Sequence, residues 1–320
     1  MRDVVIVGGG LTGLSVAYAL SSYELDVTLI EVKRHLGGSI QSTKQDEIVF
    51  DSGAFALADT LEEVWLADLG LDDALFSLGE HTVAFKQGTG QLIDALAQKM
   101  TATRLMRMAV SSIGELDSSK RFSICMENGL MFDARALVLA VPARYAERMF
   151  YGYITPITEQ LLDYHYDTIQ RVSLVCKTDD LPATLNTPPD MGFPFIHRTT
   201  HPARVPTGHT LLQFGIRIAP TQYETQTQLI DFVREAYDLP EPIASHIGFW
   251  AEADPLSCYD EQHEDWINTI QGQLPDGIAL IGSDYLPQPF SEAGVVDLNQ
   301  RIQQGIIVAE QVVSWIESIN

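Results

Sequence analysis

Cysteine is scarce in this sequence, and nothing about its placement suggests a structural role. Its three cysteines, Cys125, Cys176 and Cys258, are far apart and form no Cys-x-x-Cys pair. An odd number of widely spaced thiols fits neither a disulfide framework nor a zinc site, and it is typical of a reducing compartment. The eight histidines also lack the spacing of a metal site, so we expect no metal.

Positive charge and long apolar runs are also lacking. The chain has 20 basic against 43 acidic residues, a formal net charge of -23, which disfavours nucleic acid and anionic lipid as partners. No stretch approaches the roughly 20 apolar residues of a membrane helix, and the residues after Met1 lack a cleavage-site pattern. We therefore expect a cytoplasmic protein without stable membrane association. The oligomeric state stays open.

Glycine, in contrast, is concentrated near the N-terminus. Val4–Val7 is a short apolar run of the kind found in strands buried on both faces, and Gly8-Gly9-Gly10 ends it. A helix is expected from Leu11 to Ser21, and a second buried strand over Val27–Ile30. Strand, helix and strand together have the size of a parallel crossover unit. The pattern predicts an α/β protein with a Rossmann-type nucleotide-binding domain.

The spacing Gly8-x-Gly10-x-x-Gly13 assigns a role to each glycine. The first permits a tight turn, the second lets a pyrophosphate approach the backbone, and the third allows close packing of helix on strand. The helix N-terminus then faces the phosphates. Glu31, at the end of the next strand, is placed to accept hydrogen bonds from the adenosine ribose. The expected dinucleotide contacts here are Gly8, Gly10, Leu11, Thr12, Gly13, Glu31 and Val32.

The rest of the chain divides into two parts that differ in residue pattern. The residue pattern of the nucleotide-binding domain recurs in six predicted elements. They are a helix over Gln91–Met100, strands at Met106–Leu116, Arg121–Met126, Leu130–Leu139 and Ile278–Ile281, and a helix over Glu292–Ile316. The proline-rich middle contains strand-like runs at Ile169–Cys176, Phe193–His197 and Leu211–Ile218. We predict a second α+β domain there, built on an antiparallel sheet. The nucleotide-binding domain is assigned residues 1–57, 86–142 and 245–320, and the second domain 58–85 and 143–244.

Further motifs follow Glu31 in a fixed order. Gly37-Gly38 and Asp51-Ser52-Gly53 come first, and the run from Glu31 to Gly53 resembles the flavin amine oxidase superfamily, most closely its oxygen-dependent protoporphyrinogen oxidases. The likeness continues along most of the chain. It includes Gly88-Thr89-Gly90, Val110, Ala136–Pro142, Gly192–Ile196, Trp250, Gly282-Ser283-Asp284 and a last helix with Gly294, Gly305 and Ala309.

The resemblance implies FAD as the cofactor. It places Val110 at the adenine and Asp284 at a ribityl hydroxyl, and it aims the N-terminus of the last helix at the flavin. The FAD contacts that it adds are Arg34, Gly37, Gly38, Ser39, Gly53, Ala54, Val110, Gly282, Asp284, Gly294 and Val295. Residues Ile281–Val295 contain neither cysteine nor histidine, so we expect FAD to be bound non-covalently.

The resemblance also implies an oxidoreductase. Such an enzyme would move a hydride from a C–H bond of a small-molecule or ring substrate to flavin N5. No catalytic acid or base is assigned, and the candidate pocket residues are Phe195, Arg198, Trp250 and Tyr285. Two alternatives remain: another activity of the superfamily, such as a renalase-like, amine oxidase or desaturase reaction, and a flavin-binding protein without catalysis.

The interval between the Asp-x-Gly segment and the second glycine segment departs from the family. Only residues 54–87 fill it, where protoporphyrinogen oxidases carry a helical domain that forms much of the tetrapyrrole pocket, so the chain is nearer to renalase in size. An apolar helical stripe that includes Leu57, Leu61 and Leu69 can be hidden against the second domain. Four basic side chains of the middle region are either solvated or in contact with a substrate carboxylate: His197, Arg198, Arg204 and Arg217.

Overall fold

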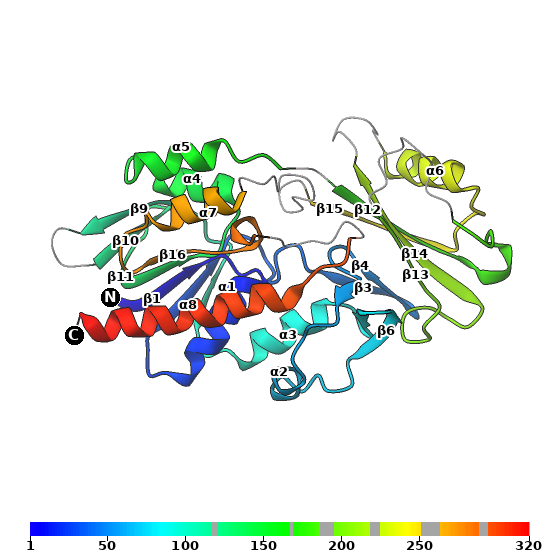
Figure 1. The fold of residues 1–320 in the computed structure, drawn as a ribbon, viewed down its shortest axis with the longest axis horizontal. Coiled ribbons are helices and arrows are strands. Elements are labelled where there is room, and N and C mark those ends of the chain that lie inside the picture. The colour runs from blue at the N-terminus through cyan, green and yellow to red at the C-terminus, as the bar shows by residue number, and fades with distance from the viewer. Residues whose placement is uncertain are drawn as a thin grey trace.

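The computed structural model describes residues 1–116, 121–166, 169–185, 195–217, 225–250, 263–287 and 294–319. Within them the chain forms two lobes that lie end to end along the long axis (Figure 1). The first lobe contains a seven-stranded sheet and the second a four-stranded sheet. Both termini lie at the end of the first lobe that is remote from the second (Figure 1).

A mostly parallel sheet forms the first lobe. Its strand order is β8-β2-β1-β11-β10-β9, and β16 also pairs with β11. Strands β8, β2, β1, β11 and β16 are parallel, whereas β10 is antiparallel to both of its neighbours, β11 and β9. The strands are β1 (Arg2–Val7), β2 (Val27–Glu31), β8 (Thr103–Met106), β9 (Val110–Leu116), β10 (Arg121–Met126), β11 (Met131–Leu139) and β16 (Ile278–Leu280).

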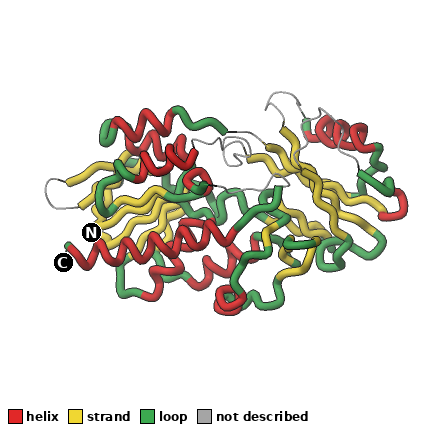
Figure 2. Tube along the Cα trace, viewed as in Figure 1, coloured by secondary structure: helices red, strands yellow, loops and turns green. Residues whose placement is uncertain are grey.

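Helices cover both faces of this sheet (Figure 2) because alternate side chains of β1 enter two different cores. Val4 and Ile6 pack with α1, α3 and α8, and Val5 and Val7 pack with α4, α5 and α7. A strand buried on both faces in this way requires a continuous apolar run. The helices are α1 (Leu11–Ala19), α3 (Gly90–Lys99), α4 (Ala143–Phe150), α5 (Thr155–Leu162), α7 (His263–Gln271) and α8 (Leu298–Ser318), with short η1 (Leu20–Ser22) and η3 (Ser283–Tyr285).

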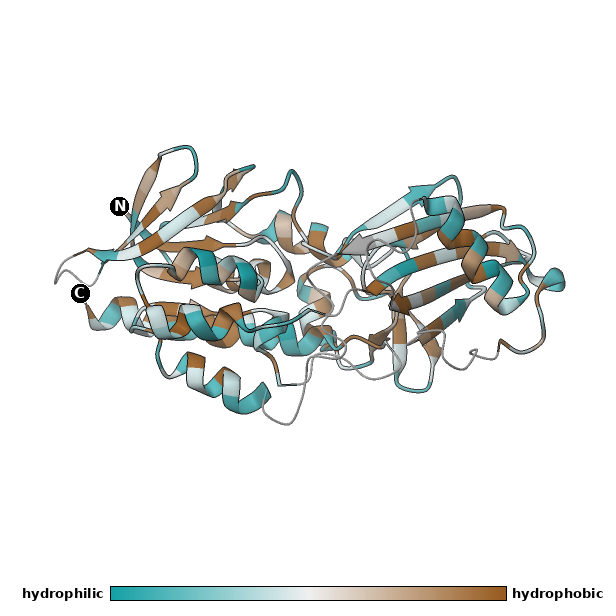
Figure 3. Cartoon of the chain, turned by 90° about the horizontal axis from the view of Figure 1, so that it is seen from above, coloured by the Kyte–Doolittle hydropathy of each residue, from teal (hydrophilic) through white to brown (hydrophobic). Residues whose placement is uncertain are grey.

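The second lobe is an antiparallel sheet that carries a helix on one face. Its order is β13-β14-β12-β15, and α6 lies against one side (Figure 3). Val172, Leu174 and Phe214 alternate toward α6, where they pack on Leu229 and Val233. The elements are β12 (Ile169–Lys177), η2 (Thr178–Asp180), β13 (Phe195–Thr199), β14 (His209–Arg217), α6 (Gln226–Tyr237) and β15 (Ala244–Trp250). The fold class that the sequence predicts is therefore confirmed.

Small elements connect the two lobes. They are β3 (Ser42–Gln45), β4 (Ile48–Asp51), β5 (Leu57–Ala58), α2 (Glu63–Asp68), β6 (Leu75–Gly79) and β7 (Thr82–Phe85). Ile48, Phe50 and Phe55 from these elements share a buried core with Val175 and Leu211 of the second sheet. The junction thus has an apolar centre of its own.

Two elements differ from the sequence prediction. The predicted strand 106–116 is two strands, because Arg107 takes a left-handed conformation (φ 58°) that ends β8. The last helix begins at Leu298 rather than at Glu292. Asp297 caps it by accepting a hydrogen bond from the Gln300 N–H, and Val296 is held extended by pairing with Leu57.

The packing also divides the chain differently from the expected domains. Helices α4 and α5 belong to the core of the first lobe, and β15 pairs with β12 in the second. Residues 143–162 therefore lie with the first lobe and 244–250 with the second. Leu57, Leu61 and Leu69 pack in the core of the first lobe, not against the second sheet. Among the helices of the described residues, none combines the length and the hydropathy needed to cross a bilayer.

Candidate cofactor-binding site

A cavity of about 340 Å³ lies where the parallel strands of the first lobe end. The carboxyl ends of parallel strands are where open α/β sheets bind their ligands. Five loops supply most of its wall, namely residues 7–12, 30–33, 37–40, 108–110 and 140–142. Gly282, Ser283 and Asp284 close one end of it, together with Arg301 of α8.

The three glycines of the first turn have different surroundings. A Cβ on Gly8 (φ 105°) would overlap the Ala140 carbonyl oxygen, and a Cβ on Gly13 would overlap the Gly8 carbonyl oxygen. Both positions thus need glycine for the fold itself. Gly10 has φ -72° and no atom within 4 Å of its would-be Cβ, although it lines the cavity. Its missing side chain leaves space for a ligand.

Helix α1 begins directly after this turn. Gly10 is its N-cap and offers no side chain to the first-turn N–H groups. Leu11 and Thr12 of that turn line the cavity. Uncapped N–H groups and the helix dipole together favour an anionic group such as a phosphate.

Glu31 sits at the carboxyl end of β2 with 7% of its surface exposed. It accepts hydrogen bonds from the Gly9 N–H and the Lys33 N–H, both at 2.7 Å. Each carboxylate oxygen has two acceptor positions, so further donors can still be bound on the cavity side. The carboxylate fixes the glycine turn as well as lining the site.

The second glycine pair lies against the first turn. The Gly37 N–H donates to the Gly9 carbonyl oxygen at 2.7 Å, and Gly37 forms a parallel bridge with Gly10. Gly37 and Gly38 have φ values of 98° and 60°, which glycine adopts readily. Gly37, Gly38 and Ser39 all line the cavity, as does Val110 on the far side.

Asp284 is buried at the other end of the cavity. It accepts hydrogen bonds from the Ala143 N–H at 2.8 Å and from the Tyr166 hydroxyl at 2.6 Å. Burial raises the pKa of the Asp284 carboxyl, and these hydrogen bonds and the Arg301 charge act against that shift. Burial and the nearby Asp284 also raise the pKa of Tyr166. The carboxyl group is therefore held in one orientation by two donors.

Several expected contacts lie away from the cavity. Arg34 lines a separate depression of about 440 Å³ beside α3. Gly53 packs behind Ser39, and Thr89 donates to the Ala54 carbonyl oxygen at 2.7 Å. Gly294 precedes α8 instead of lying within it, and a Cβ there would overlap the Phe195 ring. Val295 belongs to the core between the lobes.

The candidate pocket residues fall into different environments. Tyr285 is a core residue, stacked on Trp266 at 6.1 Å between ring centroids. Phe195 is buried beside Gly294, while Arg198 on the same strand is exposed. The side chains of Trp250 and Arg217 are not described, and residues 192–194 of the predicted substrate loop lie outside the described residues.

The second sheet has a polar inner face, which is the face opposite α6. Its polar residues are Arg171, Ser173, His197, Gln213 and His246, and Phe195, Val175 and Leu211 lie on the same face. His197 is half-buried against Phe195, and its ring contacts the Gly294 backbone through a hydrogen bond. Burial lowers the pKa of His197 to about 4, helped by the Arg171 charge and opposed by that hydrogen bond. His197 is therefore neutral near pH 7.

Two charged residues were not identified from the sequence as site residues. Arg301 is 8% exposed in the cavity wall, one turn into α8. The sequence prediction begins this helix at Glu292 and so places Arg301 in its interior, where a cation gives no signal of a site. Arg204, expected to be solvated or to contact a substrate, is instead fully buried and paired with Asp51. Among the described residues, no cluster of three or more His, Cys, Asp or Glu is placed to hold a metal.

The chain is similar to known nucleotide-binding proteins at its N-terminal end. Residues 6–68 match the NAD(P)-binding Rossmann-like domain. The sequence is 29% identical over 128 residues to protoporphyrinogen oxidase 2 of Arabidopsis thaliana, covering 39% of this chain and 24% of that protein. It is 30% identical over 91 residues to the flavin-containing amine oxidase A of Canis lupus familiaris, covering 28% and 17%. The chain thus aligns with a quarter or less of the length of these relatives.

Solved structures extend the similarity to the whole chain. A protein from Exiguobacterium sp. 255-15, assigned as a protoporphyrinogen oxidase, superimposes with a TM-score of 0.74 at 14% identity, covering 97% of this chain and 98% of its own. Wild-type putrescine oxidase bound to putrescine gives 0.67 at 14% identity, covering 98% and 99%. The chain therefore has the fold of the flavin amine oxidases, and part of it resembles protoporphyrinogen and amine oxidases in sequence.

Proposed function

We propose that this protein is an FAD-dependent oxidoreductase that binds its cofactor non-covalently in the cavity of the first lobe. The observation that carries the proposal is the cavity wall itself. Two glycine segments, the uncapped N-terminus of α1 and Glu31 meet there in the order that a dinucleotide requires. The empty space beside Gly10 fits a pyrophosphate, because a Cβ at this position would fill it.

The residues would hold FAD along the length of the cavity. Glu31 and Val110 line it at one end, where we place the adenosine, and Gly282–Asp284 with Arg301 line the other. Asp284 would accept a hydrogen bond from a ribityl hydroxyl with its second oxygen, Oδ1, which accepts one from the Ser283 hydroxyl at 3.3 Å, since Ala143 and Tyr166 both bond the first. Arg301 would add positive charge close to the cofactor. This cation extends the set of contacts expected from the sequence.

FAD, when bound, would accept a hydride from a C–H bond of the substrate at its own N5 atom. The chain would supply orientation, exclusion of water and charge. The inner face of the second sheet is the surface we assign to the substrate side, because Phe195 and His197 contact Gly294 ahead of α8. We assign no catalytic acid or base. A small amine or a reduced ring compound is the proposed substrate class, by similarity to the relatives above.

Anaerobic titration tests the proposal. The purified protein should be yellow and should release FAD, rather than FMN or NAD, on denaturation. A panel of amines, dihydronicotinamides and porphyrinogens is then added without oxygen, and bleaching of the flavin absorbance identifies the substrate class. Gly10→Val is the matched control, since it keeps the fold and fills the phosphate space. FAD bound but bleached by none of the panel would favour the non-catalytic alternative, and absence of FAD would overturn the proposal.

A further inference from the structure

A buried ion pair joins the second lobe to the small elements between the lobes. Arg204, in the connection from β13 to β14, has no exposed surface, and its Nη2 lies 2.5 Å from Oδ2 of Asp51. The Asp51 side chain is 1% exposed. A buried ion pair of this kind is costly unless the remaining hydrogen-bonding groups are also satisfied.

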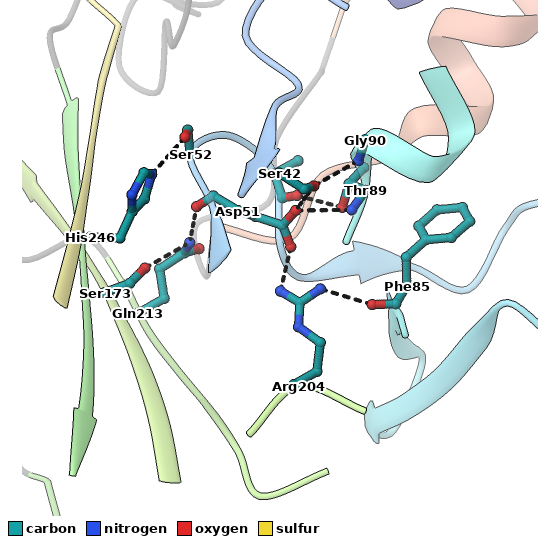
Figure 4. Close-up of polar contacts among 11 residues, drawn as sticks. Ser42, Asp51, Ser52, Phe85, Thr89, Gly90, Ser173, Arg204, Gln213 and His246 are labelled. Carbon is teal, nitrogen blue, oxygen red and sulfur yellow. Dashed lines mark hydrogen bonds and ion pairs between the residues drawn. The ribbon is translucent and has the colours of Figure 1, made fainter. Parts of the chain in front are cut away.

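Most of the remaining groups are satisfied, and by several different segments (Figure 4). Oδ1 of Asp51 accepts hydrogen bonds from the Thr89 N–H at 2.9 Å and from the Ser42 hydroxyl. The Nη1 group of Arg204 donates to the Phe85 carbonyl oxygen at 2.9 Å. The ion pair therefore ties the second lobe to β3, β4, β7 and the start of α3 at one point.

The inner face of the second sheet adds two more contacts to the same segment (Figure 4). Nε2 of Gln213 donates to the Asp51 carbonyl oxygen at 2.9 Å, and the Ser52 hydroxyl lies 2.7 Å from Nε2 of His246. Gly248 packs so closely on Ser52 that a Cβ there would overlap the Ser52 carbonyl oxygen. Strands β14 and β15 thus hold the backbone of residues 51–53.

Residues 51–53 in turn support the wall of the cofactor cavity. A Cβ on Gly53 would overlap the Ser39 carbonyl oxygen, so the two backbones are in direct contact. The Ser52 N–H donates to the Gln41 carbonyl oxygen at 2.9 Å. Ser39 and the neighbouring Gly38 line the cavity. A displacement of Asp51 would therefore be passed to the cavity wall through two backbone contacts.

We propose that Arg204 is a positioning residue for the cofactor cavity, through which docking of the second lobe and binding of FAD are coupled. The inference rests on the proposed FAD site and adds a reciprocal relation to it. If the docked lobe holds residues 37–39 in the binding geometry, FAD must stabilise the docked arrangement by the same factor. A side chain from the second lobe, remote from the cavity wall, would then set part of the cofactor affinity.

The test compares FAD affinity with the stability of the apoprotein. Apoprotein is titrated with FAD while flavin fluorescence is followed, and its unfolding is measured separately in urea. Arg204→Gln should weaken FAD binding by about 10- to 100-fold, a range typical of coupled sites. Lys177→Gln is the matched control, an exposed cation at the end of strand β12 in the same lobe, and it should leave affinity unchanged. The visible circular dichroism of residual bound FAD should change only in the Arg204 variant.

Two further variants guard against loss of folding. Arg204→Lys keeps a charge beside Asp51 and should weaken FAD binding less than Arg204→Gln. The double variant Asp51→Asn, Arg204→Gln removes both charges of the ion pair. It should lose no more FAD affinity than the worse single variant, since both substitutions act through the same ion pair. Unchanged FAD affinity in folded Arg204 variants, whatever their urea stability, would overturn the inference alone. Failure of the unaltered protein to bind FAD would overturn the proposed function, and the inference with it.

Discussion

The cofactor cavity of the first lobe and the inner face of the second sheet are built in opposite ways. The cavity is shaped largely by backbone, because Gly10, Gly37 and Gly38 contribute no side chains to it. The inner face is made of polar side chains from four strands, among them Arg171 and His197. The first surface is fixed by local turns, and the second by the register of strands that are distant in sequence.

This difference determines which residues of each surface can be substituted without loss of its structure. A backbone-built cavity has few positions at which a side chain can be added without filling it or breaking a turn. A side-chain-built face can exchange polar groups while the ladder beneath stays intact. We therefore expect substitutions in the cavity wall to act directly on cofactor occupancy. Those on the inner face should act on pH dependence and substrate choice, and on cofactor occupancy where they hold residues 51–53, as Gln213 and His246 do.

The largest effect should come from two glycines of one turn. Gly10→Val should abolish measurable FAD binding and leave the free energy of unfolding of the apoprotein within about 0.5 kcal/mol, since its Cβ has no atom within 4 Å and its methyl groups would extend from there. Gly13→Ala should instead destabilise the apoprotein by about 1–3 kcal/mol, because its Cβ overlaps the Gly8 carbonyl oxygen. Urea unfolding and FAD titration of both variants give the answer. Equal losses of FAD affinity and of apoprotein stability in the two variants would show that Gly10 and Gly13 do not have these separate roles.

Glu31 should show a mixed effect of intermediate size. Glu31→Ala removes the acceptor for the Gly9 and Lys33 N–H groups, so both FAD binding and apoprotein stability should fall by about 1–3 kcal/mol. Glu31→Gln keeps one acceptor oxygen and should lose less of each. The control is Glu24→Gln on the exposed surface. Calorimetric titration that detects no loss of FAD affinity in Glu31→Ala would remove this residue from the site.

His197 of the inner face should contribute to the pH dependence of the free energy of unfolding. The pKa of His197 is lowered from about 6.5 to about 4 in the folded chain, so the unfolded chain binds more protons between these values. The stabilising contribution of neutral His197 is complete above pH 6.5 and is lost as the pH falls toward 4. His197→Asn should flatten the profile in that window, whereas His81→Asn, at an exposed site, should not. Parallel profiles for all three proteins would contradict the assignment.

The smallest effect concerns residues 54–87, the segment between Asp51-Ser52-Gly53 and Gly88-Thr89-Gly90. Leu61, Leu66 and Leu69 are buried, and only Val64 of the apolar stripe is largely exposed, at 75%. Anionic headgroups would also be repelled by acidic neighbours such as Glu63. We expect no co-sedimentation with phosphatidylserine-rich vesicles at low salt, and no change for Val64→Lys. Substantial pelleting would show a docking surface that this segment does not provide.

The sequence predicts the first lobe better than the second for the same physical reason. The turn at Gly8–Gly13 depends on residues within one crossover unit, so spacing alone identifies it. The Asp51–Arg204 pair depends on where the connection from β13 to β14 runs, and no local pattern encodes that path. Spacing also cannot show that Arg107 would turn left-handed and split a predicted strand. Family motifs extended the site to Gly37–Ser39 and Asp284, but they could not foresee Arg301.

The C-terminal helix completes a core that the N-terminal strand begins. Gly305 of α8 packs with its Cα against Ser15 and Thr12 of α1, and β16 joins the sheet beside β11. At a synthesis rate of about 5–20 residues per second, α8 is therefore made on the order of tens of seconds after β1 and α1, whose apolar side it covers. The second sheet, from β12 to β15, has all its strands much sooner. The lobe whose first strand is translated first is thus the last to have all its elements, and until then the apolar side of β1 and α1 lacks α8.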